Sequence, residues 1–163
     1  MDGLQLKLCD MQGRLFARAG GRGLPSAAFI RLFLTSETAR ALDAAYHPAQ
    51  WMGEAYLLEE VLADMGDAEL EAGEVFPPDE LYWMGAIYRY WQIRTGESSA
   101  QILRQASVKT MRAGFMRFHP MAPELVDEAL RENHRGESQV VKARRARKKL
   151  AMSGADNAVH AEN

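Results

Sequence analysis

The spacing of apolar residues along the chain predicts helices almost throughout. From Leu4 to Ala19 apolar residues recur every three or four positions, and residues 25–34 repeat that pattern with Phe29, Ile30, Phe33 and Leu34. Further segments with helical spacing or capping signals are 36–45, 48–65, 78–95, 99–106, 108–118, 124–131 and 138–152. No run of alternating β-branched residues occurs, so we expect no strands.

The segment 78–95 differs from the others because apolar and aromatic residues lie on every side of the predicted helix. Pro78 suits its first turn, and Gly96 suits a left-handed turn that ends it. A helix that is apolar all round is enclosed by its neighbours. We therefore predict an all-α fold, a compact bundle of about seven helices around this central helix. The predicted core residues are Trp51, Tyr82, Trp83, Tyr88, Arg89 and Trp91.

The apolar periodicity fades after Asn133, which divides the chain into two parts. We predict a helical domain over residues 1–133 and a basic, partly disordered extension over residues 134–163, with the disorder beginning at Ser153. No targeting signal or membrane-length apolar stretch is present. The expected location is the cytoplasm, without membrane contact.

Charge is distributed unevenly, although the net charge is only −2. Residues 36–90 contain twelve acidic residues against Arg40 and Arg89, whereas residues 142–149 contain six bases and no acid. Charge separated in this way bears on partners rather than on the fold.

The basic tract KARRARKK predicts a nucleic-acid contact, because each phosphate bound releases counterions and makes affinity salt-dependent. Its predicted contact residues are Lys142, Arg144, Arg145, Arg147, Lys148 and Lys149. Modest support for a nucleic-acid contact comes from three further basic residues, Arg104, Lys109 and Arg112. The alternative is a solvated tail, or one that folds back on the acidic segment.

No catalytic, cofactor or metal motif is found. The four histidines, His47, His119, His134 and His160, are far apart and form no HxxxH or HExxH pair. The single cysteine, Cys9, excludes an internal disulfide and favours a core residue. We therefore predict no catalytic residue, no metal and no cofactor.

An enzymatic alternative stays open on three residues. Glu54, Arg89 and Tyr88 would line a pocket if the two strongest helices, 48–65 and 78–95, pack together. In that packing either Glu54 or Glu59 would form a buried pair with Arg89, which more often specifies packing than chemistry.

Three strings of the sequence resemble a little-characterised bacterial family. They are QWMGEAYLLEEV (Gln50–Val61), ELYWMGAIYRYWQIRTGESSAQI (Glu80–Ile102) and GFMRFHPMAPELVDEAL (Gly114–Leu130). The family pattern is QWxGExYLL, LYWxGxIYRYW, TGxSS and FHxxxP, and the similarity covers residues 26–132. Proteins of this kind are small partners encoded beside a second gene in toxin–antitoxin-like pairs. The basic tail departs from the pattern.

The resemblance implies a non-catalytic antitoxin that binds a cognate toxin from the same operon. Toxins that act on nucleic acid often present a basic cleft, which an acidic surface would complement. The residues expected to bind the toxin are Glu54, Glu59, Glu60, Asp64 and Asp67. The basic tail is a candidate for contact with operator DNA. The alternative function is a standalone nucleic-acid-binding regulator that uses the same tail.

Overall fold

The computed structural model describes residues 1–159, and this part of the chain contains helices and no strand. The helices are α1 (Gly3–Gly21), α2 (Ser26–Leu34), α3 (Glu37–Asp43), the 3₁₀ helix η1 (Pro48–Trp51), α4 (Glu54–Met65), α5 (Pro78–Thr95), α6 (Ser99–Gln105), α7 (Val108–Phe118) and α8 (Pro123–Val159). The predicted all-α bundle is confirmed. None of the helices described combines the length and the hydropathy that crossing a membrane requires.

Local signals in the sequence set several helix ends. Pro78 occupies the first turn of α5, and Gly96 ends that helix in the left-handed conformation, with φ 71°. Ser98 accepts from the Gln101 amide while the Gln101 side chain accepts from the Ser98 amide, which forms the predicted capping box of α6. Ser107 caps α7 in the same way through the amide of Thr110.

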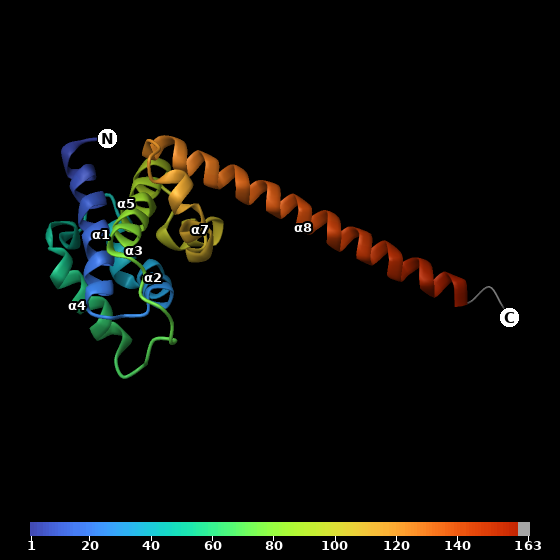
Figure 1. Ribbon diagram of the computed structural model, residues 1–163, viewed down its shortest axis with the longest axis horizontal. Coiled ribbons are helices and arrows are strands. Elements are labelled where there is room, and N and C mark those ends of the chain that lie inside the picture. The colour runs from blue at the N-terminus through green and yellow to red at the C-terminus, as the bar shows by residue number, and fades with distance from the viewer. Residues whose placement is uncertain (160–163) are drawn as a thin grey trace.

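The centre of the bundle is the crossing of α1 and α5, which run side by side in Figure 1. A Cβ atom on Gly85 would lie 2.5 Å from the Gln12 carbonyl oxygen and 2.9 Å from the Gly13 Cα. A Cβ on Gly13 would in turn lie 2.8 Å from the Tyr82 carbonyl oxygen. The two glycines therefore allow the helix backbones to touch.

The apolar core extends from this crossing to α2 and α4. Phe16 of α1 packs edge-on against Phe33 and Phe29 of α2, with ring centroids 5.3 and 6.1 Å apart. Leu57 and Val61 give α4 a buried face towards the same cluster. Burial of these faces, rather than intrinsic helix propensity, holds the shorter helices in place.

Three of the predicted core residues are fully enclosed: Tyr88, Arg89 and Trp91. The Tyr88 hydroxyl donates to the Ala106 carbonyl at 2.7 Å, and Trp91 Nε1 donates to Glu97 Oε2 at 2.9 Å. Both polar atoms of these aromatic rings are therefore satisfied. Trp83 is partly buried and packs edge-on against Phe115 with centroids 5.6 Å apart. The central segment is an enclosed helix.

Two of the predicted core residues are at the surface. Trp51 is 74% exposed because it ends η1 on the outside of the bundle, where the helical periodicity is interrupted. Tyr82 is 39% exposed because it lies at the edge of the α1–α5 contact, where its hydroxyl donates to Asp10 at 2.8 Å. Placing these two side chains in the core was wrong.

Helix α8 joins the two predicted helices 124–131 and 138–152 into one element. Val126 and Leu130 are buried against the bundle, and Arg94 Nε donates to Asp127 Oδ2 at 2.9 Å. Beyond these turns α8 projects away from the other helices (Figure 1). The helix continues past Ser153 to Val159, and the disorder predicted for residues 160–163 lies outside the described residues.

Candidate functional site

The predicted partner surface lies on the outer side of α4 and in the turn after it. Leu57, Leu58 and Val61 point into the core, which leaves the acidic positions of this helix facing outwards. The exposed acids are Glu59, Glu60, Asp64 and Asp67, whereas Glu54 is half-buried. Four of the five predicted residues are therefore accessible to a partner.

Arginines of α1 and of its C-cap neutralise two of these five acids. Glu54 lies 3.9 Å from Arg14 and 3.7 Å from Arg18, and Glu59 pairs with Arg22, which follows the last residue of α1. These pairs could not be predicted from the sequence, because they depend on α1 packing beside α4, far away in the chain. Glu60, Asp64 and Asp67 have no cationic partner among residues 1–159, so they form the uncompensated part of the surface.

One side of α4 borders a shallow hollow of about 410 Å³. Glu60 and Asp64 lie on its α4 side. The rest of its wall comes from α3, including Arg40, which pairs with Glu37 at 2.9 Å, and from His47 and Ala49 at the start of η1. Tyr56 lies one turn before Glu60, and its hydroxyl donates to Glu60 Oε1 at 2.6 Å. We call Tyr56, Glu60 and Asp64, each four residues apart, the α4 stripe.

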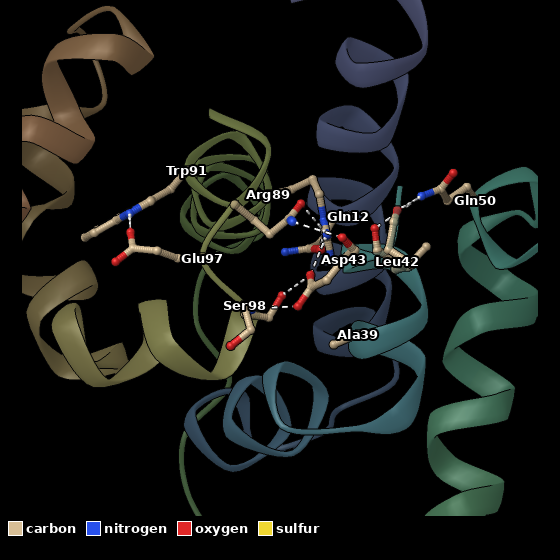
Figure 2. Close-up of polar contacts among 12 residues, drawn as sticks. Gln12, Ala39, Leu42, Asp43, Gln50, Arg89, Trp91, Glu97 and Ser98 are labelled. Carbon is tan, nitrogen blue, oxygen red and sulfur yellow. Dashed lines mark hydrogen bonds and ion pairs between the residues drawn. The ribbon is translucent and has the colours of Figure 1, made fainter. Parts of the chain in front are cut away.

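The most polar part of the interior is a network around the fully buried Arg89, drawn in Figure 2. Arg89 Nε donates to Gln12 Oε1 at 2.8 Å, and Nη1 donates to Asp43 Oδ1 at 2.8 Å and to Gln92 Oε1 at 3.0 Å. The Asp43 carboxylate also accepts from the amide and the hydroxyl of Ser99, each at 2.7 Å. The network thereby ties together α1, α3, α5 and α6.

Asp43 is the acidic partner of Arg89, so the prediction of Glu54 or Glu59 was wrong. Glu54 faces Arg18 of α1, and Glu59 pairs with Arg22 at the end of that helix. The sequence gives little indication that Asp43 pairs with Arg89, since Asp43 is one of many acidic residues and lies at the end of a short helix. Burial lowers the pKa of Arg89, and the charge of Asp43 opposes that shift.

The residues of the enzymatic alternative are not brought together. Tyr88 is bonded to a backbone carbonyl, Arg89 to Asp43, and Glu54 faces the arginines of α1. Burial also raises the pKa of the Cys9 thiol to about 11, which keeps this side chain neutral near pH 7 and makes it a poor nucleophile. Tyr88 and Arg89 are thus engaged in holding the helices, although Arg89 Nη2 has no hydrogen-bond partner among the described residues.

The basic tract of α8 is solvent-exposed along its whole length. The exposed bases are Lys142, Arg144, Arg145, Arg147, Lys148 and Lys149. None of them pairs with a carboxylate in the part of the chain that the structure describes. Because α8 projects from the bundle, the tract does not fold back on the acidic segment (Figure 1). Arg112, by contrast, pairs with Glu74 at 2.5 Å and lies 4.1 Å above the Phe76 ring.

Across residues 1–159 no group of three or more His, Cys, Asp or Glu side chains is arranged to hold a metal ion. The resemblance to antitoxin-type proteins stays a prediction from the three sequence strings. Comparison of the chain with protein-family models, with curated proteins and with solved structures finds no match.

Proposed function

We propose that this protein is a non-catalytic antitoxin-type protein that binds and neutralises a cognate toxin encoded in the same operon. The observation that carries the proposal is the acidic surface on α4 and in the turn after it, where Glu60, Asp64 and Asp67 form no ion pair among the described residues. The sequence resemblance supplies the class of partner. An antitoxin of this kind needs a complementary surface and no active site.

The exposed acidic residues on and after α4 contribute more to partner recognition than to the stability of the fold. Exposed carboxylates without a partner contribute little to stability. The same charges attract a basic partner over several ångströms, increase the association rate and disfavour partners of the wrong sign. A toxin with a basic nucleic-acid-binding cleft fits this surface.

Charge reversal on α4 tests the proposal. The double variant Glu60→Lys/Asp64→Lys is expected to bind the product of the adjacent gene about 10- to 100-fold more weakly, mainly through a slower association rate. The affinity is measured by surface plasmon resonance at low and high salt. The same variant should no longer restore growth to cells that express that product.

The matched control is Glu132→Lys/Glu137→Lys, which changes the net charge equally at two exposed positions of α8. It should bind as the wild type does. If the wild-type chain forms no complex with the adjacent gene product on gel filtration and gives no growth rescue, the proposed function is wrong.

A second candidate function, nucleic-acid binding, is favoured by one specific observation. The basic tract lies on an exposed helix that projects away from the acidic surface (Figure 1). An α-helix with its side chains is about 10–12 Å in diameter, and the major groove of B-DNA, about 12 Å wide, admits such a helix. The tract would contact operator DNA, either in an antitoxin or in a standalone regulator.

Duplex DNA binding should fall steeply with salt, since log K decreases by about 0.9 per phosphate contact for each unit of log salt. Replacing the six bases of residues 142–149 by glutamine is expected to abolish the gel shift while leaving binding to the adjacent gene product unchanged. The control is Lys7→Gln/Arg40→Gln, at two exposed positions outside α8. A shift that survives the six substitutions would exclude this function for the tract.

A further inference from the structure

Large apolar side chains are concentrated on the surface just before α4 and in its first turn. The exposed fractions are 93% for Tyr46, 74% for Trp51, 49% for Tyr56 and 40% for Met52. Single exposed apolar residues are ordinary, but a group of aromatics within eleven residues of chain marks an interaction surface. We call the three aromatic residues Tyr46, Trp51 and Tyr56 the exposed aromatic set. Folding leaves Tyr46 and Trp51 mostly exposed and about half of Tyr56 exposed.

The backbone that carries the set is held in place. The Gln50 side-chain amide donates to the Ala44 carbonyl at 2.6 Å and to the Leu42 carbonyl at 3.4 Å, so it closes the open end of α3 (Figure 2). The His47 ring nitrogen Nδ1 accepts from the Ala49 amide at 3.1 Å, and Pro48 begins η1. A surface that is ordered before binding loses less conformational entropy when a partner docks.

The exposed aromatic set and the α4 stripe share Tyr56. Helical spacing places Glu60 and Asp64 on the same side of α4 as this tyrosine, and its hydroxyl is bonded to Glu60. The combined surface therefore has aromatic side chains next to carboxylates that form no ion pair among the described residues, and the nearby Arg40 is paired with Glu37. Aromatic anchors surrounded by polar residues are the usual composition of an energetic hot spot.

We infer that Trp51, Tyr46 and Tyr56 are the anchor residues for a protein partner, which offers them an apolar pocket bordered by lysine or arginine. The inference rests on the proposed function, whose partner it describes more closely. Charge argues against a second copy of this chain. A symmetric dimer through this surface would bring Glu60 and Asp64 of both copies into one interface, where like charges repel each other.

The test uses the full chain and the product of the adjacent gene. Trp51→Ala and Tyr46→Ala are each expected to weaken binding by about 30-fold. The matched control is Met116→Ala, since Met116 is 77% exposed on α7. This variant should bind as the wild type does. Isothermal titration calorimetry gives the affinities.

A second measurement uses the unchanged protein and does not depend on how the variants fold. Of the three tryptophans, Trp91 is buried, Trp83 is partly buried and Trp51 is 74% exposed, so acrylamide quenching reports mainly on Trp51. Quenching should fall clearly when the complex forms. The signal of a Trp51→Phe variant, subtracted from that of the wild type, isolates this residue.

The outcomes separate the two proposals. A complex that keeps its affinity in Trp51→Ala and leaves Trp51 open to acrylamide overturns the anchor residues but not the proposed function. Loss of binding in Trp51→Ala with no effect of charge reversal supports the anchors and removes the role of the acids. The absence of any complex overturns both. A dimer of the free chain that Trp51→Ala dissociates, seen by sedimentation, assigns the surface to a second copy and overturns the inference.

Discussion

The Asp43→Ala variant is expected to lower the free energy of unfolding by about 3–5 kcal/mol, because it leaves the buried Arg89 cation without its carboxylate. Arg89 is fully buried and cannot turn to water. The substitution also removes the acceptor for the amide and the hydroxyl of Ser99. A domain of this size is typically stable by about 5–15 kcal/mol, so the loss is a large part of the total.

Urea unfolding followed by circular dichroism measures this change. The control is Asp64→Ala, which removes an exposed carboxylate from α4 and should alter stability by no more than about 0.5 kcal/mol. The double variant Asp43→Ala/Arg89→Met removes both charges together and should recover much of the loss. A decrease below about 1 kcal/mol in Asp43→Ala would show that Arg89 does not depend on this carboxylate.

The Gly85→Ala variant is expected to lose about 3 kcal/mol, at the upper end of the usual cost of overpacking. The added methyl group would lie 2.5 Å from the carbonyl oxygen of Gln12, which is backbone and not a side-chain tip that can rotate away. Helices α1 and α5 must then move apart. That movement strains the hydrogen bond from Gln12 Nε2 to the Gly85 carbonyl, which is 3.1 Å long.

The matched control is Gly21→Ala in α1, where no other heavy atom lies within 4 Å of the added Cβ. Alanine favours the helix over glycine there by up to about 1 kcal/mol, so this variant should unfold at a slightly higher urea concentration. If Gly85→Ala lowers the free energy of unfolding and Gly21→Ala raises it, the loss in Gly85→Ala arises from the contact between α1 and α5. Equal effects would contradict the close approach of the two backbones.

The helices could be predicted because their signals are local. Pro78, Gly96 and the Ser98–Gln101 capping box act within a few residues of where they stand, and the apolar spacing of α1 and α2 needs no distant partner. The enclosed character of α5 also followed from its own residues, since apolar groups on every side demand neighbours.

The contacts between distant segments could not be predicted. Arg89 meets Asp43 across 46 positions of sequence, and Arg22 meets Glu59 across 37. Which carboxylate pairs with each arginine depends on how the helices pack. The acidic segment contains many carboxylates that are equivalent in sequence terms. Trp51 shows a different failure, because residue type indicates burial only on average and a 3₁₀ turn has no long apolar stripe. The residue that fails as core is the one that best marks an interaction surface.

The continuity of α8 has a mechanical consequence. Among the side chains of α8 whose burial the structure describes, Leu130 is the last buried one. The basic tract begins twelve residues later at Lys142, about 18 Å along the helix axis from Leu130. An unbroken helix fixes both the distance and the orientation of the basic tract relative to the bundle. A flexible linker of the same length would fix neither. A ligand bound to the tract would be held at a set distance and angle from a protein bound to α4, so the chain would act as a rigid spacer between its two partners.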